Sequence, residues 1–95
     1  MMTCSARQDT IPAGTKAADA VLAKLADAGT SITPALDAEV QRALAMLRRE
    51  GGEPGLVRQV EQISTILFTM CQARRNGRAN LFASQQLRVR RLAAA

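Results

Sequence analysis

The sequence predicts an all-α protein, a small bundle of three to four helices with one long central helix, and a protein that self-associates. Eighteen of the 95 residues are alanine, which has the highest intrinsic helix propensity. Apolar residues recur three and four positions apart through several segments, as they do along one face of a helix. Only Phe68 and Phe82 are aromatic, so the core is thin and gains from burial against a second copy.

The length fits one domain, and the first residues are set apart from it. Residues 1–14 mix small and polar types around Pro12 and Gly14 and show no apolar period. We expect them to form a flexible N-terminal arm, and residues 15–95 to form a single helical domain.

The first helix is predicted near residues 16–28. Thr15 can cap its first turn, and Gly29 can adopt the left-handed conformation that ends a helix. The apolar residues at helical spacing are Ala18, Val21, Leu22, Leu25 and Ala28.

The second helix is predicted over residues 34–50. Thr33 can accept a hydrogen bond from a free amide of the first turn, and Pro34 suits the first helical position. Gly51 and Gly52 end the segment. Its apolar stripe consists of Leu36, Val40, Ala43, Leu44 and Leu47.

The third helix, over residues 54–75, begins at Pro54 and ends before Asn76 and Gly77, which makes it the longest. Its apolar residues cover an arc of roughly 200°, whereas one neighbouring helix covers about 100°. We therefore expect at least two helices to pack against it, from the same chain or from a second copy. The stripe with a seven-residue period is Leu56, Val60, Ile63, Leu67 and Met70, and the arc is widened by Val57, Ile66, Phe68 and Cys71.

A fourth helix is predicted over residues 80–93, with Asn80 as its cap. Residues 87–91 alternate between apolar and basic types, so a short strand remains an alternative there. The apolar side of this helix would carry Leu81, Phe82, Val89, Leu92 and Ala93.

Charge is sorted along the chain. Every acidic residue lies at or before Glu61, so residues 1–61 carry a net charge of −1 and residues 62–95 carry +6. Such a basic segment can bind an acidic protein or the phosphates of a nucleic acid, or it can simply be solvated. The six arginines concerned are Arg74, Arg75, Arg78, Arg88, Arg90 and Arg91.

The side chains for catalysis are missing. The chain has no histidine, and Cys4 and Cys71 are expected to be free thiols, with Cys71 buried and inert. We expect no enzymatic activity, no cofactor, no bound metal and no small-molecule substrate. The carboxylates that could pair, Asp37 with Glu39 and Glu50 with Glu53, lie near predicted helix ends, where acidic residues often act as caps.

Nothing in the sequence indicates membrane passage. The first residues do not resemble a signal peptide, and the longest apolar run, residues 66–70, is too short to span a bilayer. A cytoplasmic location is expected, although secretion without a cleavable signal stays open.

These observations lead to two hypotheses of function. In the first, the chain is a small helical adaptor that binds another protein, or a second copy, through the stripe of Leu56, Val60, Ile63, Leu67 and Met70, while the arginines contact an acidic partner. In the second, it is a nucleic-acid accessory or regulatory protein whose C-terminal arginines contact phosphates.

Overall fold

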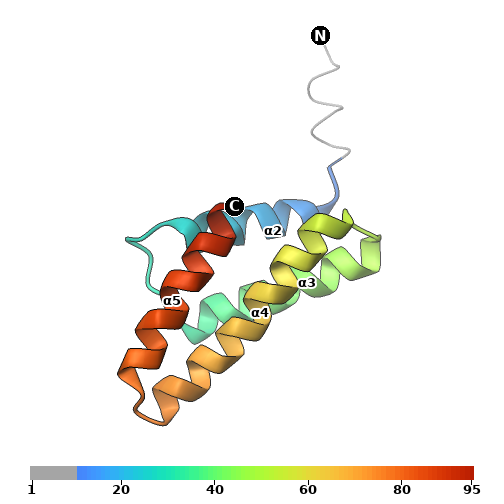
Figure 1. Cartoon of the computed structure of the whole chain (residues 1–95). Helices are drawn as coiled ribbons and strands as arrows, with labels where there is room; N and C mark the ends of the chain where they lie inside the picture. Colours follow the sequence, from blue (N-terminus) through green and yellow to red (C-terminus); the bar gives the residue numbers. More distant parts are fainter. Residues whose placement is uncertain (1–10) are drawn as a thin grey trace.

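The computed structural model describes residues 11–95, and all secondary structure in that range is helical. The predicted all-α class is therefore confirmed. The residues of the expected N-terminal arm up to residue 10, including Cys4, lie outside the described residues. The four helices are α2 (Ala13–Ala26), α3 (Pro34–Glu50), α4 (Pro54–Arg75) and α5 (Ala79–Ala94) (Figure 1).

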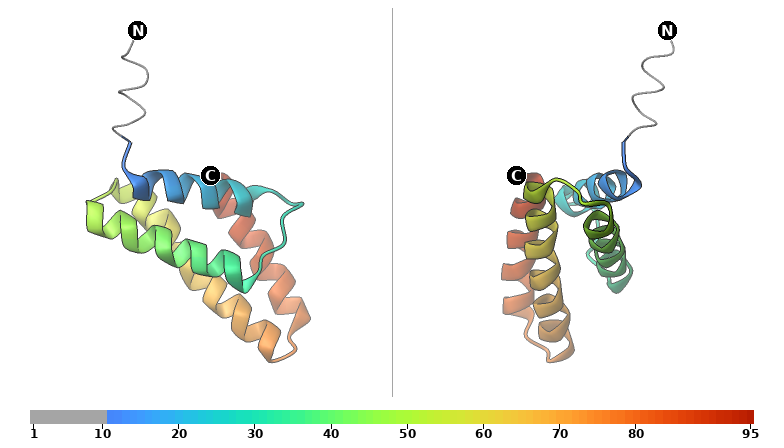
Figure 2. Two further views of the ribbon diagram at one scale, coloured as in Figure 1. Left: turned by 180° about the vertical axis from the view of Figure 1, so that it is seen from behind. Right: turned by 90° about the vertical axis from the view of Figure 1, so that its right-hand side faces the viewer.

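The helices pack in a closed ring. α3 packs against α2 and α4, and α5 packs against α4 and α2. α4 thus contacts two other helices, as its wide apolar arc predicts. It is the longest helix within residues 11–95, but each described helix packs mainly against two others, so a central position for α4 is not confirmed. In the right-hand view of Figure 2, α3 and the α4–α5 pair lie close near their connecting loop and diverge toward the turn between α4 and α5.

The core of the ring is aliphatic and receives side chains from every described helix. Leu25, Leu47, Ile63 and Val89 are each fully buried, and they come from α2, α3, α4 and α5 in turn. Phe82 is half-buried and packs against this core from α5.

Both ends of α3 and the start of α4 follow local sequence signals. The Thr33 hydroxyl accepts a hydrogen bond of 3.2 Å from the backbone N–H of Leu36. Gly51 ends α3 with a φ of 65°, which glycine adopts without steric cost. The Glu53 carboxylate accepts from the N–H of Gly55 at 3.3 Å and caps α4. The bounds of α3 and α4 coincide with the predicted ranges.

The ends of α2 differ from the prediction because a distant residue supplies the cap. α2 begins at Ala13, so Gly14 and Thr15 are inside the helix, and Thr15 is not the cap. The N–H of Gly14 donates to both carboxylate oxygens of Glu50 at 3.0 Å. At the other end the helix stops at Ala26, and Gly29 does not adopt a positive φ.

α5 also begins differently from the prediction. The helix starts at Ala79 and no side chain caps it, so Asn80 does not have the expected role. Gly77, with a φ of 72°, makes the turn between α4 and α5. Residues 87–91 are helical, so their alternation does not produce a strand.

No helix among residues 11–95 is both long and apolar enough to cross a bilayer.

Candidate functional site

The apolar stripe of α4, predicted to bind a partner, lies inside the bundle. Val60 and Ile63 are 0% exposed, and Leu67 and Met70 are 1% exposed. Leu56 is half-buried and packs against the core. A stripe covered by its own chain is not accessible to a partner or to a second copy while the bundle stays folded.

Much of the cover over the α4 stripe comes from α5, although two glutamines interrupt the apolar pattern of that helix. Gln85 and Gln86 interrupt its apolar pattern, yet Val89 is fully buried and Ala93 is 8% exposed. Gln85 and Gln86 are themselves only half-buried, and they lie at the edges of the contact. Two small apolar residues at helical spacing thus complete the burial of α4 together with Phe82.

One aromatic side chain of the wide α4 arc remains outside. Phe68 is 63% exposed, the largest exposed fraction of any large apolar residue among residues 11–95. It borders a cleft of about 730 Å³ between the start of α3 and the last turns of α4. Pro34 and Cys71 line the same cleft.

A second cleft, of about 710 Å³, lies between the α2–α3 loop and the first half of α5. The two clefts share four lining residues, Ile32, Thr33, Arg74 and Phe82. We therefore treat them as one continuous depression, named the tip groove, at the end of the bundle where α3 and the α4–α5 pair diverge.

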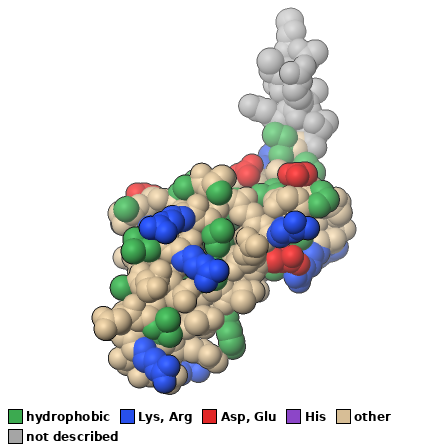
Figure 3. All heavy atoms as spheres, viewed as in Figure 1, with side chains coloured by type: hydrophobic (Ala, Val, Ile, Leu, Met, Phe, Trp, Pro, Cys, Tyr) green, Lys and Arg blue, Asp and Glu red, His purple; other side chains and the backbone are tan. Residues whose placement is uncertain are grey.

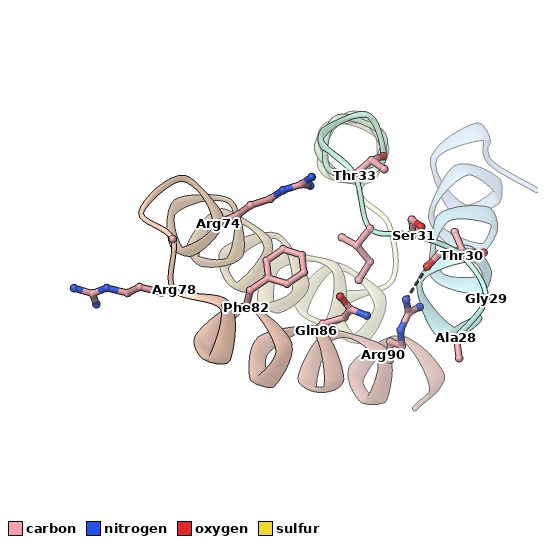
Figure 4. Close-up of a pocket in the computed structure, with 13 residues that line it drawn as sticks. Ala28, Gly29, Thr30, Ser31, Thr33, Arg74, Arg78, Phe82, Gln86 and Arg90 are labelled. Atoms are coloured by element: carbon pink, nitrogen blue, oxygen red, sulfur yellow. Dashed lines mark hydrogen bonds between the residues drawn. The ribbon is translucent and has the colours of Figure 1, made fainter.

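Figure 4 shows how the side chains of the tip groove are arranged. Phe82 and Gln86 extend from α5 into the opening, and Arg74 extends from α4 toward Thr33. Arg78 points away from the opening, at the outer edge of the α4–α5 turn. The groove therefore has an aromatic floor with basic groups at its mouth.

The arginines of this region have no acidic partner. The ion pairs formed among the described residues are Lys24 with Glu39 at 3.0 Å and Arg48 with Glu61 at 2.7 Å. Neither pair includes the arginines that line the groove. Asp37 is the one acidic residue in the lining, and it lies in the cleft that also contains Phe68. Four arginines line the groove: Arg90, whose contacts follow below, and Arg74, Arg75 and Arg78.

Arg90, predicted to bind a partner, has its guanidinium bonded to backbone carbonyls of its own chain. Its Nη1 donates to the carbonyl oxygens of Leu25 at 2.9 Å and Asp27 at 2.5 Å. Its Nη2 donates to the carbonyl oxygen of Thr30 at 2.7 Å. Leu25 lies in the last turn of α2, where a carbonyl has no partner within the helix, and Asp27 and Thr30 follow in the loop, so Arg90 binds both the end of α2 and the loop after it. No local signal reveals this role, because the partners are 60 or more residues apart in the sequence.

The remaining predicted arginines, Arg88 and Arg91, are exposed on α5 and make no ion pair with residues 11–95. Arg88 lies ten positions after Arg78, which corresponds to roughly 15 Å along a helix, and it lines neither cleft of the tip groove. The structure therefore divides the six predicted arginines into three at the tip groove, one structural residue and two on the outside of α5.

Cys71 and the carboxylates that were considered for catalysis or metal binding each contact another group within residues 11–95. Cys71 is half-buried, in contrast to the expected full burial, and its Sγ lies 4.0 Å from an oxygen of Asp37. Glu39, Glu50 and Glu53 act in an ion pair and in two helix caps. Within the described part of the chain, no three potential metal ligands cluster together.

The chain was compared with protein-family models, with curated proteins and with solved structures, and no match was found in any of the three comparisons.

Proposed function

We propose that the chain is a non-enzymatic helical adaptor that binds an acidic segment of a partner protein in the tip groove. One observation carries this proposal. An exposed phenylalanine and a half-buried one, Phe68 and Phe82, line a groove in which Arg74, Arg75 and Arg78 form no ion pair among residues 11–95. Exposed apolar groups bordered by polar groups are typical of protein-binding surfaces.

The apolar part of the groove suits an anchoring side chain. The two clefts, about 710 and 730 Å³, fall within the size range of pockets that bury a ligand or a few side chains. Phe82, Ile32 and Pro34 provide apolar contact area there. A leucine or aromatic residue of the partner inserted against Phe68 and Phe82, which line the same cleft, would remove apolar surface from water on both molecules.

The arginines favour carboxylates in the partner. A guanidinium binds a carboxylate through two parallel hydrogen bonds, which adds orientation to charge attraction. Arg74 spans the mouth of the groove between α4 and Thr33, so a carboxylate beside the anchoring side chain meets it directly. Asp37, on the α3 side of the cleft, repels an acidic group there and thereby favours one direction of the bound segment.

A selection experiment with peptides tests this proposal and does not require the partner to be identified. The folded protein is immobilised and a phage-displayed library of linear peptides is selected against it. We expect the selected peptides to combine a large apolar residue with aspartate or glutamate. Their affinity should fall at least about tenfold when Phe68→Ser is introduced, since anchors at interfaces dominate affinity.

The charge requirement is tested with a second variant and a matched control. The variant combines Arg74→Gln, Arg75→Gln and Arg78→Gln. The control combines Lys16→Gln, Arg42→Gln and Arg49→Gln, which removes the same charge from exposed positions of α2 and α3. The groove variant should lose binding while the control retains it. Selected peptides without acidic residues, or equal losses in both triple variants, would contradict the proposal.

A further inference from the structure

The outer surface formed jointly by α4 and α5 is a second feature that the tip groove does not include. The two helices are antiparallel, and the Gln59 side chain donates to the carbonyl oxygen of Leu92 at 2.7 Å. The first turns of α4 therefore lie beside the last turns of α5. Between them is a shallow depression of about 420 Å³ on the outside of the molecule, lined by Gln62, Thr65, Ile66, Thr69, Gln85, Arg88 and Leu92.

Three arginines belong to this surface, which we name the outer α4–α5 face. Arg88 lines the depression, and Arg91 follows it by one helical turn on the exposed side of α5. Arg58 precedes Gln62 by one turn on α4 and is also exposed. Because of the Gln59 to Leu92 contact, Arg58 lies at the same end of the helix pair as Arg91. None of the three forms an ion pair within residues 11–95.

The other polar groups of the face are neutral. The amides of Gln62 and Gln85 are hydrogen-bond donors, and no acidic residue lines the depression. The acidic residue next along α4, Glu61, accepts a hydrogen bond from Arg48 of α3 at 2.7 Å, which directs it toward the α3 side. Figure 3 shows basic side chains over the α5 side of this view, where no acidic side chain is drawn among them.

We propose that the outer α4–α5 face binds the phosphate backbone of a nucleic acid without reading its bases. Guanidinium groups and amide N–H groups are the groups that contact phosphate oxygens in such complexes. The face runs along two antiparallel helices that lie side by side. Its donors are therefore spread along a line, as the phosphates of a backbone are. It has no aromatic side chain on which a base can stack, since Phe68 and Phe82 line the tip groove.

The apolar content of the face favours a nucleic acid over a lipid surface. Leu87 is 60% exposed and is the one large apolar side chain on the outside of α5 with such exposure. A helix that lies in a membrane interface inserts a continuous row of large apolar residues, often with tryptophan or phenylalanine. A single leucine does not supply that row, whereas phosphate contacts need none.

The proposal is tested by fluorescence anisotropy with a short fluorescein-labelled DNA duplex, titrated between about 50 and about 200 mM salt. The test variant combines Arg58→Gln, Arg88→Gln and Arg91→Gln. We expect it to bind at least about tenfold more weakly at the lower salt concentration. The slope of log affinity against log salt should become less steep by about 3, because each lost phosphate contact removes roughly 0.9.

Two controls make the result specific to this face. The first is the triple variant at Lys16, Arg42 and Arg49, which loses the same charge elsewhere and should retain the wild-type slope. The second is sedimentation with vesicles of phosphatidylserine and phosphatidylcholine. Circular dichroism establishes that each variant keeps its helical content.

Each of two results would overturn the proposal. In the first, the wild type binds no duplex at the lower salt concentration, and if the arginine variant then loses vesicle binding, the face binds lipid instead. In the second, both triple variants lose duplex affinity equally, which indicates net charge alone. The proposal does not depend on the tip groove, whose variants at Arg74, Arg75 and Arg78 leave these three arginines in place.

Discussion

Arg90 of α5 donates a 2.9 Å hydrogen bond from its guanidinium to the carbonyl oxygen of Leu25, in the last turn of α2. The same side chain also binds the carbonyl oxygens of Asp27 and Thr30. It therefore joins the last described helix to the first and holds the loop that forms one wall of the tip groove. The charge of Arg90 therefore serves the fold, although from the sequence alone this residue resembles the arginines that could bind a partner.

Replacing Arg90 with glutamine should destabilise the fold. The variant leaves up to three carbonyl groups at the end of α2 without their charged donor, and hydrogen bonds to charged groups contribute about 1.5 to 3 kcal/mol. We expect the free energy of unfolding to fall by roughly that amount in urea denaturation followed by circular dichroism. Arg91→Gln, at an exposed position, should change it by less than about 0.5 kcal/mol. Equal effects of the two substitutions would contradict the assigned role.

Alanine at Gly14 should also destabilise the protein, although alanine favours helices. A Cβ atom there would lie 2.9 Å from the backbone nitrogen of Leu47 and 3.0 Å from the carbonyl carbon of Met46. Forcing two backbones apart costs about 1 to 3 kcal/mol, which exceeds a gain in helix propensity of less than about 1 kcal/mol. Thermal unfolding measures the difference.

The matched control for this substitution is Gly55→Ala, also in the first turn of a helix. Its Cβ atom would meet only the side chain of Glu53, which can move. We expect its melting temperature to stay close to that of the wild type, because the higher helix propensity of alanine offsets any weakening of the Glu53 cap. A Gly14→Ala variant as stable as Gly55→Ala would show that α2 and α3 are less closely packed than described.

Leu67→Ala tests whether the α4 stripe belongs to the core. The side chain is 1% exposed, so its truncation should leave a cavity and cost about 2 to 5 kcal/mol in urea denaturation. Leu87→Ala removes the same atoms from a side chain that is 60% exposed and should cost less than about 0.5 kcal/mol. A small effect of Leu67→Ala would indicate that the stripe is open to solvent and would restore the hypothesis that it binds a partner.

Stability should decrease at acidic pH partly through Asp27. Hydrogen bonds from the Gly29 N–H and the Thr30 hydroxyl, with the nearby charge of Arg90, hold the pKa of Asp27 below its ordinary value of 3.8. A depressed folded-state pKa gives stability that is fully present above the unfolded pKa and is lost as the pH falls through the folded one. We therefore expect the urea midpoint of the wild type to decrease below about pH 4.

The contribution of this carboxylate is isolated by substitution. Asp27→Asn should show a smaller decrease over the same pH interval, because asparagine does not titrate. Asp19→Asn is the control, since Asp19 is exposed and makes no hydrogen bond with residues 11–95 through its side chain. If both variants follow the wild-type curve, the loop around Asp27 does not contribute to acid sensitivity.

The two proposed surfaces should act independently. Phe68→Ser should lower the affinity for the selected acidic peptides at least about tenfold and leave duplex affinity unchanged. The triple variant at Arg58, Arg88 and Arg91 should lower duplex affinity and leave peptide affinity unchanged. The surfaces share no lining residue, so a peptide and a duplex should also bind together in one complex. Analytical ultracentrifugation with separately labelled ligands measures this. Competition between peptide and duplex would indicate one shared site.

Local signals in the sequence account for much of the fold. Thr33 with Pro34, Glu53 with Pro54, and the glycine at position 51 act on neighbouring backbone groups, so the bounds of α3 and α4 follow from adjacent residues. The seven-residue stripe of α4 likewise indicates which residues are buried, because burial follows helical spacing. The arginine content and charge sorting of the C-terminal part can be read without any structure.

The tertiary structure alone decided which surfaces are free. A stripe of apolar residues shows that a helix face is covered, but the identity of the cover depends on how α5 returns along α4, and here the cover is intramolecular. The caps of α2 come from Glu50 and Arg90, 36 and 60 or more residues away, and such contacts leave no local pattern. Side-chain spacing is a property of one helix, whereas exposure and hydrogen bonding depend on its neighbours. For that reason the sequence supplied the arginines, and only the packing of the helices separated the structural one from those that remain available to a partner.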